Sequence, residues 1–227
     1  MLLSSPLMGS EEIDLPRRPQ EPVSEEIQQI TNPQDLEAEH VHLQTLLKYI
    51  RSRKTNEAID LIYQNLAPLD VPGEDGMFPI HWACRKGDLY MFMVLITKKP
   101  DQKSIRGKGG VTPLYCAALG GNTKIIQTLL DLGVGLDEQI GSGSTVFHGV
   151  CVAGKIGAAE FLLEKNPSML VEKRKDGKTP LHAAVENKQK LMIEFLIKRL
   201  HIDVIRLSVV DKILWEKMGE LLREEQH

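Results

Sequence analysis

The hydrophobic positions of this chain recur with a period of 33 or 34 residues. Four segments carry the same residue types at the same offsets, and they open at Gly76, Gly110, Gly143 and Gly177. Each segment holds two short apolar runs with helical spacing, separated by a glycine or a polar residue. The second run of each segment contains a leucine at one fixed position: Leu95, Leu129, Leu162 and Leu196. The pattern therefore predicts two helices per segment, repeated four times.

The start of the first apolar run has its own signature. A threonine position is followed by a proline, an aliphatic residue and a histidine, and the fourth copy reads Thr179-Pro180-Leu181-His182. Threonine caps a helix well, and proline at the first helical position sacrifices no backbone hydrogen bond. Three departures stand out: Tyr115 replaces a histidine, Val146 replaces a proline, and Lys188 replaces the turn glycine. We expect looser packing in those repeats but an unchanged architecture.

With these motifs in register, the region from about residue 73 to 204 resembles the ankyrin-repeat family, whose repeats share a TPLH-x-A core and this period. The resemblance implies an all-α solenoid of stacked helix-turn-helix units with hairpin-like finger loops. It also implies that the histidines tie adjacent turns together by hydrogen bonds. The family's members bind proteins, so we expect a non-catalytic interaction module.

The flanking segments are expected to close the stack, because an interior repeat exposes an apolar face. Residues 34–72 are interpreted as a degenerate N-terminal capping repeat, since Thr45 lies 33 residues before Phe78 and Ile62 falls at the leucine position. Residues 205–227 are expected to form a C-terminal capping helix and a polar tail. Residues 1–33 combine five prolines with a net charge of −4, which predicts a flexible acidic tail.

Composition narrows the function classes. The chain has 227 residues, a net charge of −3 and three cysteines. No apolar run approaches the roughly 20 residues of a membrane span, and no long basic stripe suggests nucleic-acid binding. Few cysteines favour a reducing compartment. We therefore expect a soluble, cytoplasmic monomer with a protein partner, no cofactor, no nucleic acid and no membrane. A weaker similarity, to ankyrin-repeat effectors that intracellular bacteria secrete into the host cell cytosol, rests on the degenerate repeats and the glutamate-rich C-terminus; a generic cytosolic adaptor or subunit is the alternative.

Candidate chemistry is sparse. The run from Gly149 to Lys155 resembles a phosphate loop only in part, because Ile156 stands where a serine or threonine must bind magnesium. No cysteine and histidine spacing matches a metal site, and Cys84 and Cys151 fall in the small, buried column. The alternative function is an enzyme, or a regulatory subunit of one, with an unrecognised site. A deep pocket with convergent polar groups would indicate that alternative, whereas a long shallow groove would indicate an interaction module.

The family resemblance places a concave groove along the first helices and below the finger loops. Mapped onto this chain, the partner-binding positions are Met77, Trp82, Arg85, Lys86, Val111, Cys116, Leu119, Ser144, Val152, Lys178 and Glu186. The groove should run from a basic, aromatic end through an apolar middle to a mixed end, with Cys116 on its exposed side. Trp82 beside Arg85 has the composition of a binding hot spot. The alternative is that Trp82 packs onto Tyr49 or the N-terminal cap.

Overall fold

The computed structural model describes residues 33–200 together with residues 216, 220 and 221. Within residues 33–200 the regular elements are ten α-helices and three short 3-10 helices, with no strand. The α-helices are α1 Pro33–Arg51, α2 Thr55–Tyr63, α3 Pro79–Lys86, α4 Leu89–Lys98, α5 Pro113–Gly120, α6 Thr123–Asp131, α7 Val146–Ala153, α8 Ile156–Lys165, α9 Pro180–Glu186 and α10 Lys190–Leu200. The 3-10 helices are η1 Pro100–Ser104, η2 Lys108–Gly110 and η3 Pro167–Val171.

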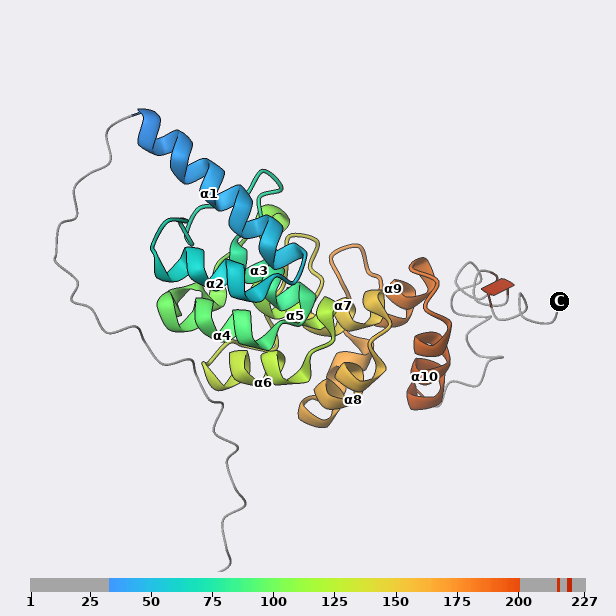
Figure 1. The fold of residues 1–227 in the computed structure, drawn as a ribbon. Coiled ribbons are helices and arrows are strands. Elements are labelled where there is room, and N and C mark those ends of the chain that lie inside the picture. The colour runs from blue at the N-terminus through green and yellow to red at the C-terminus, as the bar shows by residue number, and fades with distance from the viewer. Residues whose placement is uncertain (1–32, 201–215, 217–219, 222–227) are drawn as a thin grey trace, which may run out of the picture.

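The helices form two parallel rows, as Figure 1 shows. The first helix of each layer contacts the first helix of the next, in the order α1, α3, α5, α7 and α9. The second helices α2, α4, α6, α8 and α10 follow in the same way. The two helices of each layer also pack against each other. The all-α solenoid of helix-turn-helix layers expected from the sequence is confirmed.

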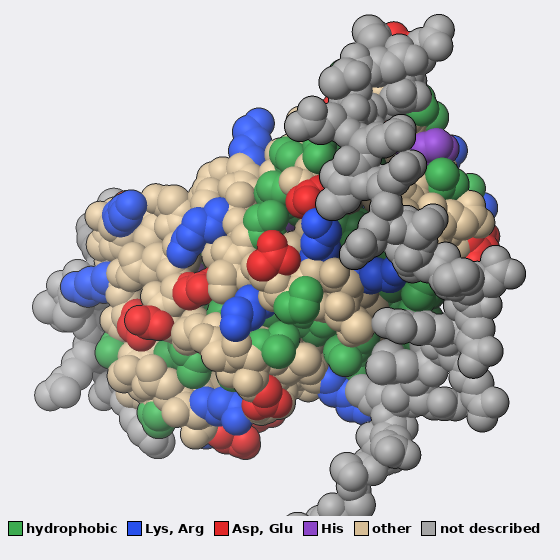
Figure 2. Space-filling model, turned by 90° about the vertical axis from the view of Figure 1, so that its left-hand side faces the viewer, with side chains coloured by type: hydrophobic (Ala, Val, Ile, Leu, Met, Phe, Trp, Pro, Cys, Tyr) green, Lys and Arg blue, Asp and Glu red, His purple; other side chains and the backbone are tan. Residues whose placement is uncertain are grey.

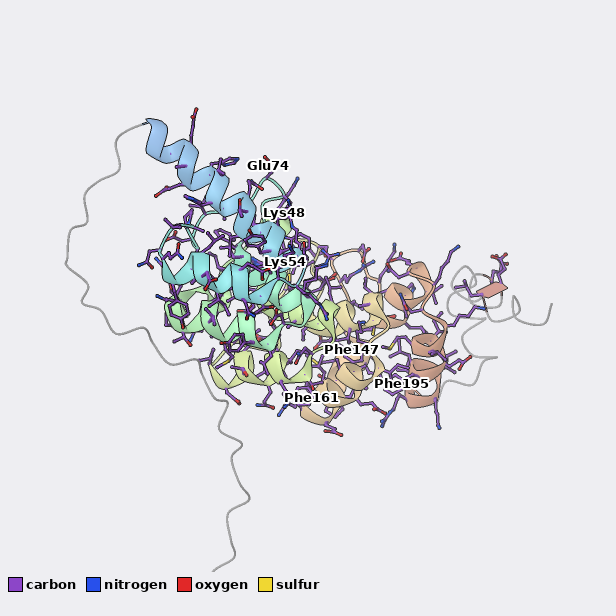
Figure 3. All side chains as sticks on the ribbon, viewed as in Figure 1. Lys48, Lys54, Glu74, Phe147, Phe161 and Phe195 are labelled. Atoms are coloured by element: carbon purple, nitrogen blue, oxygen red, sulfur yellow. The ribbon has the colours of Figure 1, made fainter. Side chains whose placement is uncertain are left out.

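The core lies between the two rows of helices. Its repeated members are the four leucines of the second helices, Leu95, Leu129, Leu162 and Leu196, each with no exposed surface. Small residues of the first helices face them, such as Ala117 and Ala184, which are also fully buried. Phe147, in the first helix α7, is also fully buried in this core (Figure 3). Burying one leucine side chain contributes about 1.5–3 kcal/mol, so each member of this column adds substantially to the stability of the stack.

The threonine and histidine positions form the helix starts. The Thr112 hydroxyl caps α5 by accepting the Tyr115 backbone N–H at 3.2 Å. At the start of α9, the Thr179 backbone N–H donates to His182 Nδ1 at 3.2 Å. Helix α7 begins at Val146 without a proline. The proline is therefore helpful but not necessary for starting the first helix.

The turn between the two helices of each layer requires a left-handed residue. Gly87, Gly121 and Gly154 occupy it in three layers, with φ between 65° and 76°. In the fourth layer Lys188 adopts φ 55°. A residue with a side chain costs roughly 1–2 kcal/mol in this conformation. The layer keeps its shape, and Lys188 carries a local strain.

The connections between layers are hairpin-like finger loops, as the sequence predicts. In each finger a backbone hydrogen bond closes a four-residue turn, and the bonds run from Gly76 to Gly73, Gly110 to Gly107, Gly143 to Ile140 and Gly177 to Arg174. The last residue of every turn is a glycine with positive φ. Neighbouring fingers are linked by further backbone bonds, such as Lys108 N–H to the Gly76 carbonyl at 2.9 Å. The fingers thus form a continuous row beside the helices.

The N-terminal end of the stack is built by α1 and α2. Helix α1 has 19 residues, more than twice the length of α3, and its second half packs on α2 and α3. Ile62 is buried at the leucine position of α2. At the other end, Leu221 is helical and joins the core with 8% exposure. The predicted tail at 1–33, except for Pro33, which begins α1, and most of the predicted capping helix at 205–227 lie outside the described residues, so the domain boundaries stay predictions.

Candidate functional site

Four equivalent positions near the ends of α3, α5, α7 and α9 carry a different side chain in every layer. They are Arg85, Leu119, Val152 and Glu186. Arg85 and Glu186 are exposed, whereas Leu119 and Val152 are half-buried. Together with Trp82 we name these residues the first-helix surface. The buried columns hold the stack together, so this surface can vary without loss of the fold.

Trp82 lies at the centre of a polar cluster that reaches back to α1. Its indole N–H donates to Asp75 Oδ2 at 3.0 Å, and Arg51 donates to the same oxygen at 2.5 Å. The Arg51 and Arg85 guanidinium groups both lie over the Trp82 ring, at 4.4 Å and 5.5 Å from its centroid. The Met77 backbone N–H occupies the other Asp75 oxygen. Trp82 is half-exposed, and its contact with Arg51 attaches the N-terminal helix to α3.

The turn between α1 and α2 extends this cluster. Arg53 adopts φ 57° and its guanidinium donates to the Lys86 carbonyl at 2.7 Å. This bond joins the turn to the end of α3. The nearby Asp88 accepts the Thr55 hydroxyl at 2.8 Å and caps α4 through the Met91 backbone N–H. Its carboxylate is therefore engaged in local structure.

The middle of the first-helix surface contains a tyrosine where the other repeats have a histidine. Tyr115 is half-buried, and burial raises the pKa of its phenol against the opposing effects of Arg174 and a hydrogen bond with Ser144. A side chain at Gly149 would meet the Tyr115 ring at 3.1 Å. The absence of a side chain at Gly149 therefore makes room for the larger ring. Leu119 and Val152 flank this region on α5 and α7.

The far end of the surface is a closed ion-pair network. Arg174 bonds Asp176 at 3.0 Å and Glu186 at 3.3 Å, and Lys178 pairs with Glu186. The hydrogen bond from Lys178, with the charges of Lys178 and Arg174, lowers the pKa of the Glu186 carboxyl. Two cations and two carboxylates balance one another there. The mixed end expected from the sequence is therefore electrically neutral.

Two predicted contact positions are not at the surface. Cys116 has no exposed area, so the expectation that it faces the groove is wrong. Ser144 is also buried, and its hydroxyl lies 2.9 Å from that of Ser142. The position after the histidine points between neighbouring first helices, so only a side chain as long as Trp82 extends past them. Gly149 and Ala183 occupy this position in the other layers and are buried as well.

The finger positions Met77 and Val111 are half-buried and serve the stack. Met77 packs against the core, and the Val111 carbonyl accepts a hydrogen bond from His81 Nε2 at 2.9 Å. The His148 ring makes the matching bond to the Lys178 carbonyl at 3.4 Å. These bonds confirm that the histidines tie adjacent turns together. Burial lowers the pKa of both imidazoles, more than the backbone bonds raise it.

The three cysteines, which are the strongest nucleophiles considered from the sequence, are committed to packing. Burial raises the pKa of all three thiols, to about 12 for Cys116. Among the described residues no group of three or more histidine, cysteine and acidic side chains could hold a metal ion. The segment resembling a phosphate loop is the end of α7 and the turn after it. A hollow of about 350 Å³ between α4, α6 and α8 is lined by Leu89, Thr123, Lys124, Gln127, Thr128 and Phe161, which form no acid–base pair.

Two functional candidates escaped the sequence reasoning: Arg51 and Asp75. Asp75 and Asp176 occupy the same position of two fingers. This repetition could have marked Asp75 as a residue with a shared polar role. Arg51 belongs to the non-repeated part of α1, so no column marked it. Lys178 and Glu186 were predicted separately, and their opposite charges within one repeat could have suggested a pair.

Surface charge on the N-terminal side of the molecule is mixed. Figure 2 shows basic side chains scattered among acidic and hydrophobic ones on the visible part of that face. Among the described residues visible on this face there is no continuous basic stripe of the kind that nucleic-acid binding requires. In the described part of the chain, every helix is too short or too polar to cross a membrane.

Comparison with known proteins identifies the repeat. A family profile described as ankyrin repeats (3 copies) matches residues 46–140 and 132–206, which together make up well over half of the chain. The chain is 32% identical over 88 residues to 26S proteasome non-ATPase regulatory subunit 10 of Dictyostelium discoideum, covering 39% of this chain and 38% of that protein. It is 29% identical over 125 residues to alpha-latrotoxin-Lt1a of Latrodectus tredecimguttatus, covering 54% and 9%. It is 24% identical over 156 residues to rabankyrin-5 of Mus musculus, covering 68% and 13%. The chain thus spans well under half of each of these relatives.

Proposed function

Because the chain belongs to the ankyrin-repeat family, we propose that it is a non-catalytic module that binds a partner protein along its first helices and finger loops. One observation carries the proposal. The buried columns repeat from layer to layer, whereas the first-helix surface presents Arg85, Leu119, Val152 and Glu186 in turn. A row of non-repeating side chains on a repeating scaffold is suited to recognising one extended partner surface.

The proposed contact residues are those that the fold leaves accessible: Trp82, Arg85, Lys86, Leu119, Val152, Lys178 and Glu186. Arg85 and Trp82 offer the residue types most often found at binding hot spots. Lys178 and Glu186 are already paired with each other, so they fit a rim role. At Met77 and Val111, we expect the partner to contact the backbone of the finger more than the half-buried side chains.

An enzymatic function is the weaker alternative. His81 and His148 hold adjacent fingers, and Cys116 is buried with a raised pKa. These groups are thereby occupied in the fold, and none of them is an activated nucleophile or base. This favours the interaction module over catalysis.

The proposal includes a cytosolic location and a single copy of the chain. The three buried, unpaired thiols suit a reducing compartment. The relatives named above come from a slime mould, a spider and a mouse, so they add no support to the effector resemblance. The proposed function does not depend on that origin.

The test is capture of partners from a native lysate with matched surface variants. Leu119→Asp changes the middle of the first-helix surface, and Lys124→Glu changes an exposed residue of α6 in the other helix row. We expect one set of captured proteins to disappear with Leu119→Asp and to remain with Lys124→Glu, both variants being folded by circular dichroism. Identical capture by both variants would place binding elsewhere and refute the proposal.

A further inference from the structure

Within the described residues, the row of first helices has one concentration of charge that ion pairs do not balance. It lies at the N-terminal end of the row. Five cations gather there, and we name them the N-terminal basic cluster: Arg51, Arg53, Lys54, Arg85 and Lys86. They come from the end of α1, the turn after it and the end of α3. The Arg53 bond to the Lys86 carbonyl and the shared Trp82 ring show that these segments adjoin.

The two aspartates beside this cluster form an ion pair with only one of its five cations, the pair between Asp75 and Arg51. Both oxygens of Asp75 are occupied, by Arg51, the Trp82 indole and the Met77 backbone. Both oxygens of Asp88 are occupied by Thr55 and the start of α4. In the described part of the chain, no ion pair involves Arg53, Lys54, Arg85 or Lys86. Arg53 bonds the Lys86 carbonyl, so Lys54, Arg85 and Lys86 are the cations of the cluster whose charged groups are left to bind an external anion.

Arg51 and Arg53 have structural bonds, to Asp75 and to the Lys86 carbonyl, and the fold alone does not require the other three cations. Basic residues in a last helical turn favour the helix dipole, and α1 and α3 both have them. However, α5, α7 and α9 end without any basic residue in the last turn and are equally well formed. A stabilising role at the helix end therefore does not account for the concentration in the first two layers.

The surroundings of the cluster indicate what kind of anion fits. Arg51 and Arg85 lie over the Trp82 ring, and a free guanidinium in this setting binds a carboxylate through two parallel hydrogen bonds. The next positions along the row are the half-buried Leu119 and Val152, followed by the neutral network at Glu186. A nucleic acid or an anionic membrane would need cations further along the row. An extended peptide needs charge only at one end.

We propose that the N-terminal basic cluster binds an acidic peptide segment of the partner, whose apolar residues continue over Leu119 and Val152. This inference rests on the proposed function, binding of a partner protein, and specifies the chemistry of that partner. Arg85 is the main recognition residue because it is exposed and lacks an ion pair. Trp82 positions the Arg85 side chain, and Asp75 holds Trp82 in place.

The test is selection from a random dodecapeptide library against the full chain, followed by fluorescence anisotropy with each enriched peptide. We expect enriched peptides to carry several aspartates or glutamates next to apolar residues. Arg85→Glu should weaken their binding by about tenfold or more, and high salt should weaken it too. Arg85→Lys keeps the charge and should lose less, while the matched charge change Lys124→Glu in α6 should leave binding unaltered.

The outcomes separate this inference from the proposed function. Enriched peptides without acidic residues that lose binding with Leu119→Asp would overturn the acidic segment and leave the proposed function standing. Peptides that bind independently of both Arg85 and Leu119 would overturn both. Tighter Arg85-dependent binding of single-stranded RNA or of phosphatidylserine vesicles than of any peptide would also overturn the inference. Thermal unfolding of each variant distinguishes lost binding from lost folding.

Discussion

Replacing Leu129 by alanine tests the packing between layers most directly. Leu129 lies in α6, has no exposed surface and belongs to the leucine column that joins the second helices. Helix α6 contacts α4 on one side and α8 on the other. The truncation therefore opens a cavity in an interior layer that has neighbours on both sides.

The expected cost follows from the lost side chain and the cavity. A fully buried leucine loses about 2–5 kcal/mol of stability on truncation to alanine, and the value rises with the volume that cannot collapse. Helices packed on both sides of α6 restrict collapse, so we expect the upper half of this range, roughly 3–5 kcal/mol. A domain of this size has a total stability of about 5–15 kcal/mol. A single substitution should thus remove a large share of it.

The measurement is urea unfolding followed by far-ultraviolet circular dichroism, with Leu132→Ala as the matched control. Leu132 lies just after the last residue of α6 and is 37% exposed, so the same chemical change should cost well under about 1.5 kcal/mol. Equal unfolding midpoints for Leu129→Ala and the unmodified chain would refute the packing described here. A Leu132→Ala effect as large as that of Leu129→Ala would have the same meaning.

Three further predictions concern strain, protonation and thiol reactivity. Lys188→Gly should raise the free energy of unfolding by about 1 kcal/mol in urea titrations, because glycine adopts the left-handed φ of 55° without strain; a fall in stability would show that the lysine side chain contributes more than its strain costs. The pKa values of His81 and His148 are lowered in the folded chain, so their contribution to stability is complete above about pH 6.5 and is lost as the pH falls through their lower folded pKa values; a melting temperature that stays constant from neutral pH to about pH 5 would contradict this. Burial raises the pKa of Cys116 to about 12, so a thiol reagent at neutral pH should label it only after unfolding; rapid labelling of the native chain, detected by mass spectrometry, would contradict its burial.

The repeat pattern predicts most of the fold because each column has one physical role in every layer. The leucine column, the threonine and histidine starts and the finger glycines all appear where the period of 33 places them. Even the departures follow this logic, since Lys188 takes the glycine conformation and Gly149 makes room for Tyr115. Each repeated residue position determines the local backbone conformation of its layer, and these conformations together define the stack.

The candidate site was less predictable because exposure depends on side-chain reach and on partners outside the column. Trp82 and Cys116 occupy the same backbone position, yet the first is half-exposed and the second is buried. The attachment of Trp82 to α1 runs through Arg51, which no repeat column contains. The structure gives Trp82 both partial exposure and a contact with Arg51 of the N-terminal helix, so its part in partner binding stays a prediction.

The row of linked fingers has a mechanical consequence for the first-helix surface. Backbone bonds join neighbouring fingertips at Lys108 to Gly76, Gly141 to Gly109 and Lys175 to Ser142, with N···O distances of 2.9, 2.7 and 3.3 Å. Such a row acts as an edge of nearly fixed length, so bending of the stack must occur by compressing or spreading the helix rows. A partner that spread the first-helix surface would stretch this edge at its longest bond, between Lys175 and Ser142. Adaptation to different partners should therefore begin with a swing of the α9 and α10 layer while the first three fingers stay joined.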